Sequence, residues 1–421
     1  MAFKDIRKSR KWLSAEEIRI IVALLILLSA LLALNLWLAR TLPAGEWLYL
    51  RWSGARAFLF DEIQPYSTQV AQGVQQIVYG RDAFATEYRY VLNDPIYILL
   101  LYTPLALFPD FTIARAVWML TAEIALFTSV LFSYRLSEWP PPRALNIILV
   151  GFGLFNFFSL NALVTASPTI LLNFLYLGIL LSLRSFSDEL AGGLLFLSAY
   201  QWEVSGLFFL FVILFVIGNR RWGVLAGFGM ALIVALIATF LIDPGWGLPY
   251  IRAVISNIIQ SVRLNLGVIL SGWFPEARFS LGGVVSIFLI VVVFLESLGA
   301  VDAPFRRVVW VASLALAGMP LVGLGMFPSN YVVLVLPLIL VISLVWERWL
   351  RRRLIAVILI LFAFLFVPFW LYLETVVAYA PFYTELLYVL PPVAMLAALY
   401  WMRWWVVRSP RIWADQIGNR R

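Results

Sequence analysis

Long apolar segments recur along almost the whole chain, separated by short polar breaks. Most have about 18 residues or more, which lets a helix cross a hydrocarbon core of about 30 Å. The pattern therefore predicts an all-α, polytopic membrane protein that forms a single integral membrane domain over residues 1–421. We predict about twelve spans, at 19–39, 95–109, 112–133, 144–162, 166–183, 189–217, 222–243, 279–299, 308–326, 330–347, 353–372 and 384–406.

Two polar interruptions, 40–94 and 244–278, are too large to be turns, and we predict that both are extracytoplasmic loops. In the first, Leu48, Trp52, Ala55 and Leu59 recur at helical spacing. This spacing predicts a helix lying in the outer interface of the membrane, with its aromatic side chains at headgroup depth. The Pro-Tyr-Ser at 65–67 ends this helix and starts a second segment.

The sixth predicted span, 189–217, is long and has the polar sequence YQWE at its middle. It is either two half-helices or one tilted, broken helix. A membrane tolerates such a break only where protein or a cavity covers the freed backbone groups.

Composition narrows the chemistry that the chain can perform. Hydrophobic residues make up 63% of the chain and charged residues only 13%, and the chain has no cysteine and no histidine. Soluble proteins carry about a quarter charged residues. Disulfides, Cys/His zinc sites and catalytic His or Cys residues are excluded, so any chemistry uses Asp, Glu, Lys, Arg, Tyr, Ser or Thr. We predict no cofactor, although a divalent metal is compatible with the sequence.

The chain has a net charge of +8, and the positions of its Lys and Arg residues along the chain indicate its orientation in the membrane. With the N-terminus inside, most Lys and Arg residues lie in cytoplasmic segments, as the positive-inside rule requires. We therefore predict a multi-pass cell membrane protein with both termini cytoplasmic, no cleaved signal peptide and no nucleic-acid partner.

Three acids of the first outer loop, Glu46, Asp61 and Asp94, are candidate general bases for an acceptor hydroxyl. The alternative is that such a loop carboxylate is simply solvated and has no catalytic role. For Asp94, which precedes Pro95, the alternative is a helix cap. The acids within spans, Glu123, Glu203 and Glu296, are costly to bury and are therefore functional candidates, with structural pairing as the alternative.

Glu203 has a polar neighbour, Gln201, in the break of the sixth span. Guanidinium groups of the outer loops could hold a phosphate, although headgroup contact is the alternative. The candidates are Arg51, Arg56, Arg81 and Arg252, with Arg89 and Arg263 as further members.

The stretch WSGARAFLFDEIQPYS…IVYGRDA…DPIY…YTPLALFP…ARAVW resembles glycosyltransferase family 87, the polyprenol-phosphate-sugar-dependent membrane transferases related to α-mannosyltransferases. DELAGGLLFLSAYQWEVSGLFFL…NRRW and the later DPGW resemble the middle section of that family. The resemblance covers roughly residues 44–260.

The resemblance implies a GT-C-like fold and a hexosyltransferase that takes a hexose, mannose favoured, from a polyprenyl-phosphate donor to a lipid or glycan hydroxyl. It also implies that an acidic residue of the outer loop acts as general base and that Arg or Lys residues of the loops hold the departing phosphate. The configuration at the anomeric carbon of the sugar would be inverted. Where the family tends to have Asp before the loop Trp, this chain has Glu46 beside Trp47, so the base stays open among Glu46, Asp61 and Asp94.

Two other classes are compatible with the sequence. A transporter or lipid flippase would use midplane acids such as Glu203 and Glu123, but it predicts related halves that the chain lacks. A scaffolding membrane protein would account for the spans but not for the outer loops.

Overall fold

The computed structural model describes residues 14–84, 87–260, 264–277, 280–324, 327–349 and 351–407, and every regular element in these ranges is helical. The elements are α1 (Ala15–Thr41), α2 (Glu46–Phe60), α3 (Thr68–Tyr79), α4 (Ile96–Leu101), α5 (Thr103–Ala106), α6 (Phe111–Leu136), α7 (Arg143–Phe155), α8 (Phe157–Val164), α9 (Thr169–Arg184), α10 (Asp188–Ser198), α11 (Trp202–Gly218), α12 (Trp222–Ile242), α13 (Gly247–Gln260), α14 (Leu266–Trp273), α15 (Leu281–Leu298), α16 (Phe305–Gly318), η1 (Met319–Leu321), η2 (Pro328–Leu334), α17 (Val335–Arg348), α18 (Arg353–Ala378), α19 (Pro381–Trp401) and α20 (Arg403–Val407).

Within the described ranges, seven helices are long and apolar enough to cross a membrane, or eight if the bent pair α7 and α8 forms one span. The most apolar stretches of α1 and α12 are only 6% and 11% buried by the rest of the protein. Long helices with exposed apolar side chains on all faces are unstable in water and stable in lipid. The prediction of a polytopic helical membrane protein is therefore confirmed.

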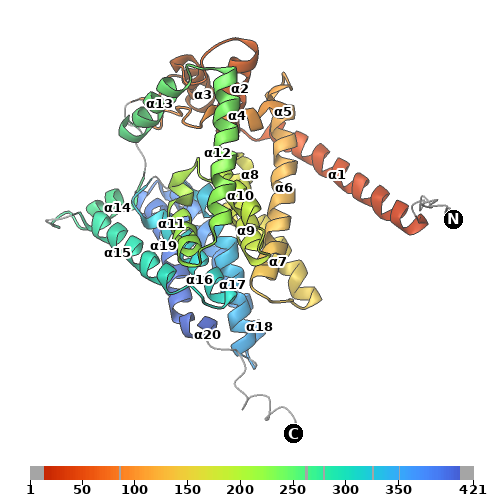
Figure 1. The fold of residues 1–421 in the computed structure, drawn as a ribbon, viewed down its shortest axis with the longest axis vertical. Helices are drawn as coiled ribbons and strands as arrows, with labels where there is room; N and C mark the ends of the chain where they lie inside the picture. Colours follow the sequence, from red (N-terminus) through yellow and green to blue (C-terminus); the bar gives the residue numbers. More distant parts are fainter. Residues whose placement is uncertain are drawn as a thin grey trace, which may run out of the picture.

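The helices form a bundle with a cap at one end. The cap consists of α2 to α5, their connecting segments and α13, and it covers the upper ends of the long helices in Figure 1. It is held together by Gln64, which donates to Asp243 (2.9 Å), and by the Tyr66 and Tyr250 rings, 5.8 Å apart. We call the end of the bundle beneath the cap the site end, and the opposite end the far end.

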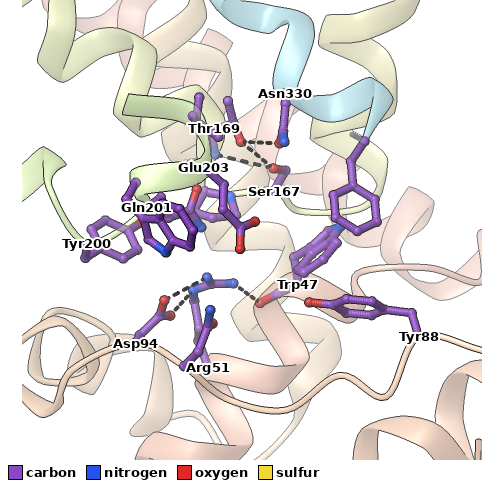
Figure 2. Close-up of a pocket in the computed structure, with 15 residues that line it drawn as sticks. Trp47, Arg51, Tyr88, Asp94, Ser167, Thr169, Tyr200, Gln201, Glu203 and Asn330 are labelled. Carbon is purple, nitrogen blue, oxygen red and sulfur yellow. Dashed lines mark hydrogen bonds and ion pairs between the residues drawn. The ribbon is translucent and has the colours of Figure 1, made fainter. Parts of the chain in front are cut away.

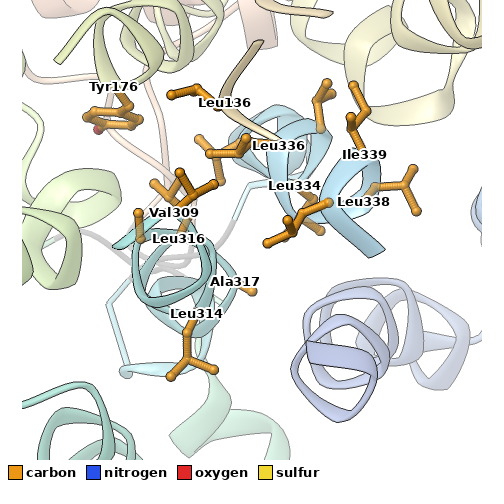
Figure 3. Packing of buried hydrophobic residues seen from close by; sticks show 14 of the residues in the cluster. Leu136, Tyr176, Val309, Leu314, Leu316, Ala317, Leu334, Leu336, Leu338 and Ile339 are labelled. Carbon is orange, nitrogen blue, oxygen red and sulfur yellow. The ribbon is translucent and has the colours of Figure 1, made fainter. Parts of the chain in front are cut away.

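The core of the bundle surrounds α17. The apolar stretch that includes this helix, Pro328–Arg348, is 89% buried inside the protein. Leu336 and Ile339 of α17 pack with Leu316 of α16 and Tyr176 of α9 in one large cluster, part of which is drawn in Figure 3. A helix that is apolar all round and buried on all sides is a central helix. By packing against its neighbours, α17 holds the ends of the surrounding helices in place at the site end.

The predicted span 95–109 is not one helix. It forms α4 and α5, of six and four residues, which belong to the cap. Their apolar side chains, including Ile98 and Leu105, pack with Leu48 of α2 and Trp118 of α6. Protein therefore covers much of the apolar surface of this segment, although Leu101 and Leu107 stay exposed. A 15-residue run lies near the lower limit for a span, where buried core segments are equally common.

Of the two alternatives for the predicted span 189–217, the structure has the two half-helices. They are α10 and α11, separated by Ala199–Gln201. Asp188, at the start of α10, pairs with Arg221, which follows α11, and Arg221 also donates to the Leu183 carbonyl (2.8 Å). Both ends of the segment therefore lie at the far end, and the break lies at the site end. The linkers 134–143 and 184–188 also lie at this far end, where Arg184 pairs with Glu138; twelve successive spans with the N-terminus inside would put both linkers outside.

The predicted outer helix is present as α2, and protein covers most of its apolar stripe. Leu48, Trp52 and Ala55 are 0%, 8% and 1% exposed, because they pack against α5, which is also part of the cap, and against α6 of the bundle. Only Leu59 of the predicted apolar stripe stays exposed, at 38%. Because this stripe is packed against α5 and α6, the neighbouring face of α2, which carries Trp47 and Arg51, is directed toward the bundle.

The contact between α10 and α12 depends on glycine. A Cβ at Gly192 would collide with the carbonyl oxygen of Val224 and lie 2.5 Å from the amide nitrogen of Phe228. We expect Gly192→Ala to lower the free energy of unfolding by about 1–3 kcal/mol, the cost typical of overpacking. Gly193→Ala is the matched control, because its Cβ would meet nothing within 4 Å. Thermal unfolding in detergent checks both, and equal midpoints for the two variants would contradict the account.

A candidate active site beneath the cap

A polar cavity lies between the cap and the site end of the bundle. It encloses about 490 Å³ of space between protein atoms, including its opening. Five segments that are far apart in the sequence meet there, and Figure 2 shows how their side chains converge. They are the start of α2, the linker before α4, the start of α9, the break between α10 and α11, and the start of η2.

Arg51 and Asp94 form a buried ion pair in the wall of the cavity. Nε of Arg51 lies 2.6 Å from one Asp94 oxygen, and an NH2 nitrogen donates to the other at 3.2 Å. The Arg51 side chain also donates to the Trp47 carbonyl at 2.9 Å. A guanidinium has five N–H donors, so these contacts engage only part of its capacity. Arg51 is thus held rigidly and keeps capacity for an anion.

Electrostatics keep Arg51 charged. Burial would lower the pKa of Arg51, but the carboxylate of Asp94 raises it above the usual value. Burial raises the pKa of Asp94, Arg51 opposes this shift, and the charge of Glu203 adds to it. Glu203 is therefore close enough to Asp94 to act on its charge, and the cavity holds two coupled carboxylates beside one fixed cation.

Glu203 lies in the first turn of α11, immediately after the break. Its carboxylate points into the space between Arg51 and Trp47 in Figure 2, and the side chain is half-buried. A helix N-terminus favours a negative charge. Gln201, the residue before α11, lines the same cavity. Of the two cavity acids, Glu203 faces the open space, whereas both oxygens of Asp94 face Arg51.

Hydroxyl and amide groups form the side of the cavity opposite Arg51. The Thr169 hydroxyl donates to the Asn330 side-chain oxygen at 3.1 Å, and the Ser167 hydroxyl donates to Thr169 at 3.1 Å. These bonds tie the start of α9 to the start of η2. Such groups are typical of a site that orients a polar ligand.

Aromatic rings line the remaining wall. Trp47 lies edge-on to Phe327, with ring centroids 4.9 Å apart, and 5.7 Å from Tyr88. The wall links α2, the 87–94 linker and the segment before η2, so it fixes the cap on the bundle.

An apolar groove lies next to the cavity, and Tyr200 lines both. The groove encloses about 740 Å³ between α4, α6, α9 and α10, again including its opening. It reaches the surface at Leu101, which is 59% exposed. The remaining lining residues are aromatic or aliphatic: Ile98, Tyr102, Trp118, Leu171, Leu172, Phe174, Leu175 and Leu197. The polar cavity and the apolar groove are therefore neighbours, with the Tyr200 side chain between them.

Four of the predicted site residues are brought together in the cavity: Arg51, Asp94, Gln201 and Glu203. Two of them come from the outer loop and two from the interrupted sixth span. Asp94 is not the N-terminal capping residue of α4, which was the alternative role for it. Pro95 is the residue that precedes α4, and Asp94 pairs with Arg51 instead.

The other predicted bases lie elsewhere. Glu46 is at the start of α2, where its carboxylate accepts from the Gly45 amide at 3.0 Å and feels the charge of Arg115. Burial raises the pKa of Glu46 above its usual value. Asp61 is exposed at the other end of α2. Neither lines the cavity.

The other predicted phosphate-binding residues also lie outside the cavity. Arg56 donates to the Ala106 carbonyl at 2.8 Å and stacks over Trp52. Arg81 pairs with Glu87 at 2.7 Å. Arg252, together with Arg89, lines a separate groove of the cap, and Arg263 lies outside the described residues.

The other two acids that the sequence placed within spans have structural partners. Glu123 accepts from Asn35 of α1 at 3.1 Å, and Glu296 pairs with Arg403 at the far end at 2.8 Å. The structural alternative therefore accounts for both.

Sequence reasoning missed the hydroxyl, amide and aromatic members of the cavity. They are Trp47, Tyr88, Asn93, Ser167, Thr169, Tyr200, Phe327 and Asn330. A signal existed in the short polar breaks ASPT (166–169) and PSN (328–330), which interrupt apolar segments. The position of ASPT at the site end was hidden because residues 95–109 were counted as a membrane span, which put the start of the fifth predicted span on the opposite side.

Within the described ranges, no three acidic side chains gather closely enough to hold a metal ion. Comparison with family models, with curated proteins and with solved structures gave no match.

Proposed function

We propose that this chain is an inverting membrane hexosyltransferase that moves a hexose, mannose favoured, from a polyprenyl-phosphate donor to a hydroxyl of a lipid or glycan acceptor. The observation that carries the proposal is the meeting of two environments at Tyr200. On one side lie a fixed cation and two carboxylates, and on the other lies an apolar groove. A lipid-linked sugar phosphate has the same division between a charged head and an apolar tail.

In this mechanism, Arg51 binds the donor phosphate. A buried guanidinium already oriented by Asp94 stabilises the charge that develops on the leaving phosphate without further reorganisation. Asp94 is then a positioning residue, because both of its oxygens face Arg51.

Glu203 takes the role of general base, since a base must reach the proton that it removes and Glu203 faces the cavity. The acceptor oxygen attacks the anomeric carbon, and its proton passes to Glu203. The bond between that carbon and the phosphate oxygen breaks, and polyprenyl phosphate leaves with the electron pair. A single displacement of this kind inverts the anomeric centre.

The distribution of charge supports an extracytoplasmic site. The far-end linkers are rich in arginine: Arg135, Arg143, Arg184, Arg220, Arg221, Arg306, Arg307, Arg351, Arg352 and Arg353. Applied to this arrangement, the positive-inside rule puts the far end in the cytoplasm of a cell and the cap outside. Cytoplasmic termini and a GT-C-like arrangement of about twelve traverses remain part of this proposal.

A transporter or flippase has less support. Ion pairs tie the far-end linkers to one another, among them Arg184 with Glu138 and Arg306 with Glu347, at 2.7 and 2.6 Å. The core around α17 is filled by side chains. The residues that line the polar cavity all lie in the cap or at the site end of the bundle, as a transferase requires.

Filling the groove should impair use of a long-chain donor. In Leu175→Trp, the larger side chain would occupy the groove, and we expect KM for a long-chain polyprenyl-phosphate-mannose to rise by about tenfold, equal to the loss of roughly 1.4 kcal/mol of apolar contact. The KM for a donor with a short prenyl chain should change little.

The control is Ile147→Trp, which adds the same side chain at a position on α7 that is 74% exposed and outside the groove. Steady-state transfer of labelled mannose in detergent measures both constants. An equal rise in KM for the long and the short donor would refute the groove as the chain-binding site.

A further inference from the structure

The cap contains a second, larger groove that the mechanism above does not use. It encloses about 1350 Å³, including its opening, between α3, residues 82–83 and 89–91, and α13. Its wall is built firmly: the buried Gln75 donates to the Arg89 carbonyl at 2.6 Å and accepts from the Ala83 amide at 2.8 Å. The groove is therefore a formed feature of the cap.

The lining of this groove suits an anion with hydroxyl groups. Arg89 and Arg252 contribute two guanidinium groups, and Gln64, Ser67, Thr68 and Ser256 contribute amides and hydroxyls. The acid in the lining, Asp82, accepts from Gln72 and Gln76 at 3.3 and 3.4 Å. Arg252 is exposed and forms no ion pair with any described residue. The groove has more positive than negative charge, which favours an anionic ligand.

The helix α13 places the groove at the membrane surface. One face of α13 presents Leu248, Ile251, Ile255 and Ile258, which are 57%, 53%, 50% and 57% exposed. The opposite face contributes Arg252 and Ser256 to the groove. An amphipathic helix of this type lies in the interface with its apolar face among lipid chains. It follows directly on α12, whose exposed apolar surface ends at Ile242.

A single residue connects the groove with the candidate active site. Tyr66 lines the groove, and its hydroxyl donates to the backbone carbonyl of Asp94, a residue of the active-site wall, at 3.0 Å. The two cavities therefore lie on either side of the Tyr66–Asp94 contact.

We infer that this groove binds the phosphate-bearing head group of an anionic lipid in the outer leaflet, and that this lipid is the acceptor. The assignment as acceptor rests on the proposed transfer function, whereas binding of the head group does not. The guanidinium of Arg252 would contact the phosphate, and the amides and hydroxyls around it would contact the polar part of the head group.

The test measures binding without any transfer. Because the chain has no cysteine, Ser256→Cys gives one labelling position for an environment-sensitive fluorophore in the full-length protein. The labelled protein is reconstituted in phosphatidylcholine nanodiscs with increasing amounts of phosphatidylglycerol. We expect a saturable change in fluorescence, and a half-saturating fraction about fivefold higher after Arg252→Gln and about 25-fold higher after Arg252→Glu.

The matched control is Arg40→Gln, which removes an exposed arginine at the end of α1, outside the groove. Its half-saturating fraction should equal that of the parent. An equal shift in Arg40→Gln and Arg252→Gln, or no saturable response in the parent, would overturn the proposal. Soluble glycerol phosphate at the same concentration should not compete, and competition would overturn the lipid as the source of the anion. If the groove binds the lipid but a separate assay with labelled donor gives no transfer, the proposed function fails and the binding site stands.

Discussion

Asp94→Ala is expected to lower the free energy of unfolding by about 3–5 kcal/mol, the typical cost of leaving one member of a buried ion pair without its partner. The side chains of Arg51 and Asp94 are only 3% and 2% exposed, so water cannot replace the lost carboxylate. Equilibrium unfolding in mixed micelles measures the loss. A change of less than about 1 kcal/mol would show that the pair is solvated and would contradict the geometry of the site.

The double variant Arg51→Met, Asp94→Leu separates stability from function. Replacing both charges by apolar side chains of similar size removes the unpaired cation, so most of the lost free energy of unfolding should return. Transfer activity should not return, because the phosphate has lost its cation. Recovered activity in the double variant would remove Arg51 from the mechanism.

Glu203→Gln is expected to reduce kcat for hexose transfer by about 10²–10⁴-fold, the usual contribution of a general base. The substitution keeps the size of the side chain and removes only its ability to take a proton. The KM for the donor should change little, since Arg51 and the apolar groove bind it. Steady-state kinetics with labelled donor in detergent measure both constants.

Glu46→Gln and Asp61→Asn are the matched controls for this prediction. Both remove a carboxylate of the outer loop by the same chemical change, and neither carboxylate lines the cavity. We expect both variants to keep kcat within about threefold of the parent, a barrier change of less than about 1 kcal/mol. A large loss in Glu46→Gln with Glu203→Gln active would return the base to the start of α2.

The helical membrane architecture could be predicted from the sequence because it depends on local apolar runs. The placement of individual spans depended on what covers each run, and this is not local. Ile98, Tyr102 and Leu105 are apolar because they pack with α2 and α6, and the stripe on α2 is apolar for the same reason. Hydrophobicity does not distinguish a side chain covered by protein from one covered by lipid.

The sequence pointed to the charged residues of the candidate site but not to the neutral ones. Arg51, Asp94 and Glu203 are conspicuous in sequence because charge is costly to bury, and the structure brings them together. Neutral residues such as Thr169 and Asn330 carry no such signal, since hydroxyls and amides also occur at ordinary helix ends. Their role depends on the meeting of α9 with η2, which are 161 positions apart at the hydrogen bond that joins them.

The measurement that tests the central claim most directly is transfer of labelled mannose from polyprenyl-phosphate-mannose to membrane lipid, in membranes containing the parent protein or Glu203→Gln. The account predicts labelled product with the parent, release of polyprenyl phosphate in equal amount, and loss of both in the variant. Absence of transfer by the parent with mannose, glucose and galactose donors alike would contradict the proposed function.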